Sequence, residues 1–129
     1  MKKIVLICYL VAMGIAGYAQ TTIPAKKISK QDFETNVNQL QSLIAQNKQE
    51  DAKQKWTDLH NMMLSEFAEL KLMIKAADDA HNEPDKANYM NVLKSQVSIY
   101  SEVVKYKNNL FSDKAALLSN LQRYNQSLL

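Results

Sequence analysis

The sequence predicts an all-α fold, a small antiparallel bundle of four helices. Three observations lead to this prediction. Beyond residue 28, apolar residues recur at alternating spacings of three and four, which is the period of one helix face. Both glycines of the chain, Gly14 and Gly17, precede this part, so the hairpin turns of a β fold would lack their preferred residue. The two prolines, Pro24 and Pro84, fall outside the periodic segments, where they interrupt no helix.

The first residues have the pattern of a secretory signal peptide. Lys2 and Lys3 precede an apolar run at 4–16, and Gly17 and Ala19 supply the small residues of a cleavage site. We expect cleavage after Ala19 and export to the periplasm or out of the cell. The apolar run is 13 residues long, shorter than the ~20 that cross a bilayer. No stable membrane insertion is therefore expected after cleavage, and a retained N-terminal anchor is the alternative.

Removal of the leader, residues 1–19, changes the chemistry open to the chain. It takes away the single cysteine, Cys8, and with it any disulfide, thiolate metal site or c-type haem. Of the 16 Lys and Arg, two lie in the leader, which leaves 14 against 13 Asp and Glu. That balance does not predict a nucleic-acid-binding surface. The one basic cluster is Lys26, Lys27 and Lys30, which we interpret as a solvated tail; attraction to an anionic surface is the alternative.

The first predicted helix covers 30–46 and opens a helical domain at 29–129. Ser29, with Asp32 three residues later, has the arrangement of a capping box. Apolar residues then follow at spacings of four, three and four: Phe33, Val37, Leu40 and Ile44. The segment 20–28 before this helix has no such pattern, so we expect a flexible lead-in.

The second predicted helix covers about 50–78. Its main stripe alternates spacings of three and four and contains Ala52, Trp56, Leu59, Met63, Phe67, Leu70, Ile74 and Ala77. Further apolar residues widen this stripe, namely Met62, Leu64, Ala68, Leu72 and Met73. A wide apolar arc is typical of a helix that contacts more than one neighbour.

The third predicted helix covers about 85–109, with Pro84 at or just before its start, where a missing N–H costs little. Its first stripe contains Met90, Leu93, Val97, Tyr100, Val104 and Phe111. Its second, adjacent stripe contains Tyr89, Val92, Ile99, Val103, Tyr106 and Leu110. Two stripes imply burial on two sides, so this helix is expected to be central to the packing.

The fourth predicted helix begins after a cap at Ser112 or Asp113 and runs to about 127. Its apolar face contains Leu117, Leu118, Leu121, Tyr124 and Leu128. Two short connections and one loop of medium length between consecutive helices favour an up-down-up-down bundle. If the third and fourth helices continue without a break through 108–112, the result is a three-helix bundle instead.

The second stripe of the third helix is also the candidate interaction surface. Tyrosine is amphipathic and common at protein interfaces. If the neighbouring helices leave this stripe uncovered, its exposed residues mark a site for a protein partner or a second copy of the chain. The candidate residues are Tyr89, Ile99, Val103 and Tyr106. The alternative is an ordinary core stripe in which the tyrosine hydroxyls reach the rim.

Two groups of residues have the chemistry of metal ligands. His60 and Met63 on the second helix offer an imidazole and a thioether, a pair that suits reduced copper. The main loop at 78–85 gathers possible calcium or zinc ligands at close spacing, namely Asp78, Asp79, His81 and Glu83. We favour structural interpretations for both groups, a boundary histidine packed on Trp56 and a polar loop at a helix end, and expect no metal.

In size, export and helix count the chain resembles the soluble four-helix b-type cytochromes. That family ligates haem through a methionine near the start of its first helix and a histidine in its last helix. The first predicted helix here has no methionine and the fourth no histidine, so we expect no haem or other cofactor.

The function expected from these patterns is binding without catalysis. No histidine stands in a context that indicates a nucleophile activated by a base, so we do not expect an enzyme. The wide apolar arcs favour a module that binds a protein partner or a second copy of itself. A periplasmic metal carrier, with copper at His60 and Met63 or a divalent ion at 78–85, is the alternative.

Overall fold

The computed structural model describes residues 23–129, so the predicted leader lies outside the described residues. Four helices make up this part of the chain: α2 (Lys30–Ala45), α3 (Gln49–Asp79), α4 (Glu83–Val104) and α5 (Lys114–Ser127). Between 23 and 129 there is no strand. The all-α prediction is confirmed. The three-helix alternative is wrong, because turns at 105–113 separate α4 from α5.

Side chains close the N-terminal ends of α2 and α4. Ser29 accepts a hydrogen bond on its Oγ from the backbone N–H of Asp32 at 3.1 Å, which confirms the predicted cap of α2. Asn82 does the same for α4 with the N–H of Asp85 at 3.2 Å. Pro84 lies in the first turn of α4, where it removes no helical hydrogen bond.

Two residues with positive φ end α2 and α3. Asn47 has φ 56° and His81 has φ 55°, both in the left-handed region. The N–H of each of these two residues donates to the carbonyl three residues earlier, and the N–H that follows donates to the carbonyl five residues earlier, which is the Schellman arrangement. Glycine is the usual residue at such a position, and the chain has none beyond Gly17.

The end of α4 differs from the prediction. The helix stops at Val104, five residues before the expected end at 109. The N–H groups of Lys105, Tyr106 and Lys107 each donate to the carbonyl three residues earlier, so the chain tightens and leaves the helix. Tyr106 therefore lies in the turn at 105–113 and not on α4.

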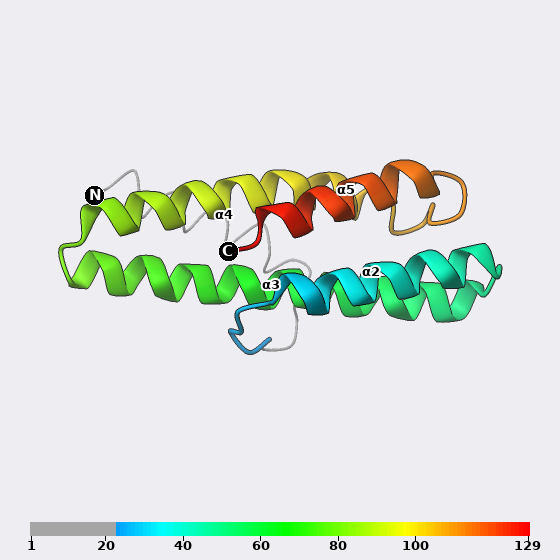
Figure 1. Cartoon of the computed structure of the whole chain (residues 1–129), viewed down its shortest axis with the longest axis horizontal. Coiled ribbons are helices and arrows are strands. Elements are labelled where there is room, and N and C mark those ends of the chain that lie inside the picture. Colours follow the sequence, from blue (N-terminus) through cyan, green and yellow to red (C-terminus); the bar gives the residue numbers. More distant parts are fainter. Residues whose placement is uncertain (1–22) are drawn as a thin grey trace.

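The four helices form an antiparallel bundle in which each helix packs on two neighbours (Figure 1). The packed pairs are α2 with α3, α3 with α4, α4 with α5, and α5 with α2. The last pair closes the ring, so α2 lies diagonal to α4 and α3 diagonal to α5. This is the up-down-up-down arrangement expected from short connections.

The helices differ greatly in length, and this gives the molecule two parts. α3 has 31 residues and α4 has 22, but α2 has 16 and α5 has 14. The lead-in before α2 meets α3 at Ser65, whose carbonyl accepts from the N–H of Lys26 at 3.1 Å. The end of α5 meets α4 at Gln96, whose Nε2 donates to the carbonyl of Ser127 at 3.3 Å.

Beyond Ser65 and Gln96, only α3 and α4 of the described helices continue, as Figure 1 shows. We call this two-helix part, residues 68–95, the arm, and the four-helix part the body. At ~1.5 Å per residue, each helix of the arm extends ~20 Å past the body. The step is the end of the body at the base of the arm, formed by residues 26–32 and 127–129.

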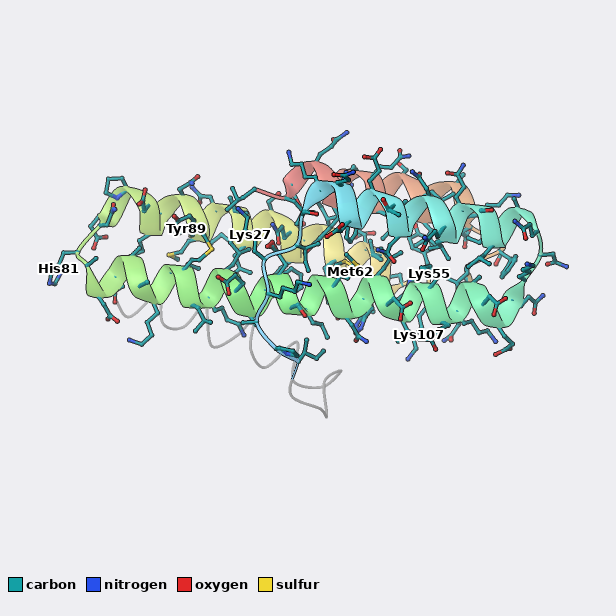
Figure 2. The ribbon with its side chains drawn as sticks, turned by 60° about the horizontal axis from the view of Figure 1, so that its bottom comes forward. Lys27, Lys55, Met62, His81, Tyr89 and Lys107 are labelled. Atoms are coloured by element: carbon teal, nitrogen blue, oxygen red, sulfur yellow. The ribbon has the colours of Figure 1, made fainter. Side chains whose placement is uncertain are left out.

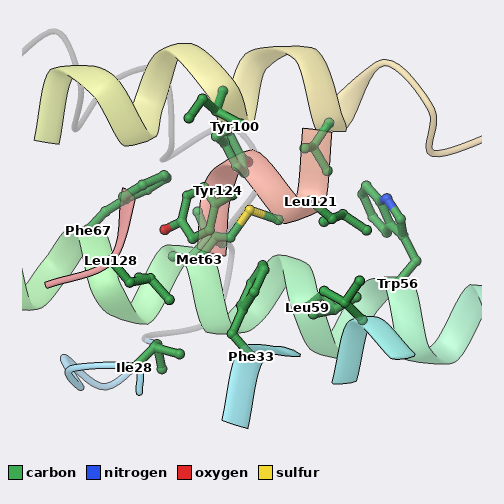
Figure 3. Close-up of a cluster of buried hydrophobic side chains, with 14 of the residues drawn as sticks. Ile28, Phe33, Trp56, Leu59, Met63, Phe67, Tyr100, Leu121, Tyr124 and Leu128 are labelled. Atoms are coloured by element: carbon green, nitrogen blue, oxygen red, sulfur yellow. The ribbon is translucent and has the colours of Figure 1, made fainter. Parts of the chain in front are cut away.

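The core of the body contains residues from all four helices and from the segments on either side (Figure 3). Phe33 and Phe67 both pack on Tyr124, and their ring centroids lie 5.1 and 6.2 Å, respectively, from the centroid of the Tyr124 ring. Ile28, in the segment expected to be a flexible lead-in, is buried in this cluster. The described part of that segment, 23–28, is therefore attached to α3 over its second half.

Candidate functional site

A group of buried polar residues lies at the level of the step. Glu66 of α3 is 2% exposed, and its Oε1 accepts from the N–H of Ile28 at 3.4 Å. Gln96 of α4 is fully buried; its Oε1 accepts from the hydroxyl of Tyr124 at 3.1 Å, and its Nε2 donates to Ser127. These contacts attach the lead-in to α3 and the end of α5 to α4. They fix where the body ends and the arm begins.

Burial is the largest cause of the pKa shifts in this group. It raises the pKa of Glu66, and the hydrogen bond from Ile28 and the nearby charge of Lys27 oppose that rise only in part. Glu66 Oε2 makes no hydrogen bond within the described residues. Burial also raises the pKa of Tyr124 well above its usual value. The hydrogen bonds of Gln96 to Tyr124 and Ser127 hold α5 against α4.

His60, the copper ligand of the alternative interpretation, lies in an aromatic stack. Its ring is parallel to Trp56 at a centroid distance of 5.1 Å, and its Nε2 shares a 2.8 Å hydrogen bond with the hydroxyl of Tyr100. Burial lowers the pKa of His60, which keeps the ring neutral at pH 7. Met63 is fully buried in the core. The structure therefore gives His60 a hydrogen-bonded packing role and does not turn it with Met63 toward an open site.

The acidic loop is organised by lysines and by helix caps. Asp78 pairs with Lys86, which holds the pKa of that carboxyl below its usual value. Lys86 also pairs with Glu83 at 3.8 Å, and the exposed Asp79 pairs with Lys75 at 2.8 Å.

The remaining residues of this loop do not converge on a shared point. Asp85 accepts from Nδ2 of Asn82, the cap of α4, and His81 is exposed at the turn. Within 23–129, no group of three or more His, Cys, Asp or Glu residues is arranged to hold a metal ion. The loop forms the acidic tip of the arm, which we define as residues 75–86.

The four candidate interaction residues fall into two environments. Ile99 is 7% exposed and Val103 is fully buried. They follow Gln96 on the face of α4 that meets α5, so α5 covers this half of the stripe. Tyr89 and Tyr106 are half-buried, one on the arm and the other in the turn after α4. Ile99 and Val103 therefore have the core environment given above as the alternative, and the four residues do not form one exposed surface.

Among residues 23–129, one apolar face of the arm has no neighbour. The stripe of α4 that meets α5 continues past Gln96 into the arm as Val92 and Tyr89, both half-buried. The stripe of α3 that meets the lead-in at Glu66 continues into the arm as Met73, also half-buried. Neither α2 nor α5 reaches this level (Figure 1). We call the surface of Met73, Tyr89 and Val92 the open face.

Of the open face, only Tyr89 was predicted from the sequence to be an interaction residue. Met73 and Val92 belong to the apolar stripes already recognised, and nothing in their spacing distinguishes them from core residues. The signal that could have found them is the difference in predicted helix lengths. The first and fourth helices are too short to cover the full length of the second and third.

A groove of about 570 Å³ lies beside the step, between the lead-in, α2 and α3. Lys27 and Met62 project toward it in Figure 2. Its wall combines the apolar Ile23 and Met62 with polar groups that include Lys26 and Asp58. The groove continues the surface of the step and places two lysines of the basic cluster on it.

No protein-family model, curated protein or solved structure matches the chain. Among the helices that the structure describes, none combines the length and the apolar character needed to cross a membrane.

Proposed function

We propose that this chain is a small exported protein that acts by binding another protein chain through the open face of the arm, without catalysis. The observation that carries the proposal is the length mismatch of the helices. α3 and α4 extend ~20 Å beyond α2 and α5, and their core-facing stripes continue to the level of Met73 and Tyr89.

The charged and nucleophilic groups support binding more than chemistry. His60 is packed and hydrogen-bonded, and Glu66 is buried against the lead-in. Of the exposed carboxylates of the tip, Asp79 and Glu83 are paired with lysines and Asp85 accepts from Asn82. Apolar and aromatic residues on the open face have the composition of a protein contact, in which partly exposed Tyr and Met are common.

Site-specific photo-crosslinking tests the proposal. A benzophenone amino acid in place of Tyr89 is expected to give a discrete adduct in cells of the native host, whereas the same group in place of Leu72 is expected to give none. Leu72 is a suitable control because it is 56% exposed on the neighbouring side of α3. Absence of any adduct from position 89, or equal adducts from both positions, would remove the arm as the binding surface.

Export is a separate part of the proposal and has its own test. The lysine pair, the apolar run 4–16 and Ala19 support a cleaved leader. The intact mass of the protein recovered outside the cytoplasm is expected to correspond to a chain that begins at Gln20. Recovery of the protein only in the cytoplasm, with the leader retained, would contradict export and leave the binding surface unaffected.

A further inference from the structure

We propose that the partner of the open face is a second copy of this chain, and that two arms pair antiparallel to form a four-helix bundle across a two-fold axis. The inference rests on the proposed function and names its partner. In the body, α2 and α5 cover α3 and α4. In the dimer, the arm of the second copy takes the same place on the arm of the first.

The dimensions of the arm fit this arrangement. The face that α2 and α5 leave uncovered is two helices wide and ~20 Å long, and so is the arm itself. When two copies are placed face to face with opposite directions, each arm fills the space above the other and each tip reaches the step of its partner. A two-fold contact of this kind is closed, because each copy uses the same surface and none remains unpaired.

The residues on the open face suit a self-complementary contact. Val92 and Tyr89 continue the α5-facing stripe of α4, and Met73 continues the stripe of α3. In the dimer these residues would form one more layer of the core, of the kind that Ile99 and Val103 form in the body. Met and Tyr adapt well to such a layer, since one is flexible and the other amphipathic.

Charge complementarity favours the antiparallel direction. From Lys75 to Lys86 the tip carries four carboxylates and two lysines, and Asp79 and Glu83 are 63% and 68% exposed. The step carries three exposed lysines, Lys26, Lys27 and Lys30.

The step also contains the positive N-terminal end of α2. Even with Asp32 and the carboxyl end of the chain counted, the step is net positive and the tip is net negative. Each tip would therefore meet an attractive surface on its partner, twice in one dimer.

The size of the contact sets its expected strength. A face ~20 Å wide and ~20 Å long gives a flat footprint of ~400 Å² per copy. Together the two copies give ~800 Å² of flat area, below the ~1,200 Å² at which standard specific interfaces begin, so side-chain relief and the contact of tip and step have to supply the rest. We expect a dimer with a dissociation constant in the micromolar range, visible as a concentration-dependent mass.

Sedimentation velocity on the purified protein, from low micromolar to several hundred micromolar, tests the pairing directly. The wild-type chain is expected to shift from monomer to dimer. A Met73→Glu, Val92→Glu variant is expected to weaken the dimer at least ~tenfold, because it places two charges in the shared layer. The Leu72→Glu variant is the matched control and is expected to dimerise like wild type. A wild-type chain that stays monomeric throughout would overturn the inference.

A charge-exchange experiment fixes the partner and the direction without touching apolar residues. One variant combines Lys26→Glu, Lys27→Glu and Lys30→Glu; the other combines Asp79→Lys and Glu83→Lys. Each alone is expected to dimerise roughly tenfold more weakly than wild type, since tip and step then have the same sign. Mixed in equal amounts, they are expected to form a heterodimer, because both tips then meet a step of opposite charge.

The outcomes separate this inference from the proposed function. If the mixture gives no more dimer than either variant alone, the antiparallel pairing of tip and step is wrong. If position 89 crosslinks to a chain of different mass while the protein is monomeric, the binding proposal stands and the self-pairing falls. If position 89 crosslinks to nothing, both fall.

Discussion

Glu66 and His60 are the two ionisable side chains of α3 that the bundle buries among aromatic and apolar residues. Burial shifts their pKa values in opposite directions. It raises the pKa of the carboxyl and lowers that of the imidazole, because in each case the neutral form is favoured. Each has one hydrogen bond that connects separate parts of the chain, Glu66 to Ile28 and His60 to Tyr100. Single substitutions can therefore measure what these links contribute.

Replacing Glu66 by Gln is expected to remove a pH dependence of stability. The folded pKa of Glu66 lies above its unfolded value, near 4.5. Its contribution is therefore fully present below that value and is lost as pH rises toward the folded pKa. The amide introduced by the substitution still accepts from the N–H of Ile28 but cannot ionise. The unfolding free energy of E66Q minus that of wild type should rise with pH above about 4.5.

Urea denaturation of both chains between pH 4 and pH 8 measures this difference. Titration of His60 and of the exposed groups is common to both proteins and cancels in the comparison. A difference that stays constant with pH would show that the carboxyl of Glu66 is equally solvated in the folded and unfolded chains.

Replacing Tyr100 by Phe is expected to destabilise the body by about 1–2 kcal/mol. The change removes the hydroxyl that shares a hydrogen bond with His60 but keeps the ring that packs edge-on against Phe67 at 5.2 Å. Tyr89→Phe in the arm is the matched control, with an expected effect within ~0.5 kcal/mol. Equal stability of the two variants in chemical denaturation would mean that the hydrogen bond of His60 contributes nothing measurable.

At the scale of the elements, most helix starts can be predicted from the few residues around them. The start of α2 followed from Ser29 and Asp32, and the start of α4 lies two residues before the sequence placed it. The end of α4 could not be found in this way. Leu110 in the following turn is buried in the core, so the apolar pattern continues after the helical hydrogen bonds have stopped. Periodicity reports which side chains face the core, not which backbone geometry carries them.

The turn after α3 offers a prediction about backbone strain. His81 is exposed and holds a left-handed conformation that costs a residue with a Cβ ~1–2 kcal/mol. His81→Gly is expected to raise the unfolding free energy by about 0.5–1 kcal/mol, the remainder being lost to the flexibility of glycine in the unfolded chain. Asn47→Gly, where Asn already tolerates this conformation, is expected to gain less. Thermal unfolding of both variants and of wild type measures which substitution gives the larger gain in stability. An H81G variant that is less stable than wild type would contradict the prediction.

The whole molecule shows why the site was only partly predictable. The stripe containing Ile99 and Tyr89 is continuous in sequence, but α5 covers one end of it and leaves the other uncovered. Which end is exposed depends on how far α5 reaches along α4, and that depends on packing between segments distant in sequence. The fold class followed from local periodicity, whereas the open face follows from the relative lengths of four helices.

The two parts of the molecule are expected to differ in local stability. Each helix of the body packs on two neighbours, but within the described chain each helix of the arm packs on only one. Fewer buried contacts per residue mean a lower free energy of local opening. In dilute solution, hydrogen exchange at backbone amides near Ile74 and Leu93 should therefore be faster than near Leu59 and Val103.

Hydrogen exchange in concentrated solution shows whether the arm opens easily because it is unstable by itself or because its partner is absent. If two copies pair, the arm gains protection as concentration rises, while the body changes little. Arm and body amides that exchange at the same rate in dilute solution would show that the arm is as stable by itself as the four-helix part.

The carboxyl end of the chain has a practical consequence for anyone who fuses something to it. Leu128 is buried and the carbonyl of Ser127 is held by Gln96, so a purification tag, a fluorescent reporter or a surface anchor joined after Leu129 would emerge at the base of the protruding hairpin. Such an appendage would crowd the space into which the acidic tip of a neighbouring molecule is expected to fit. A reporter inserted between Asn108 and Asn109, at the opposite extremity of the rod, would leave that space clear.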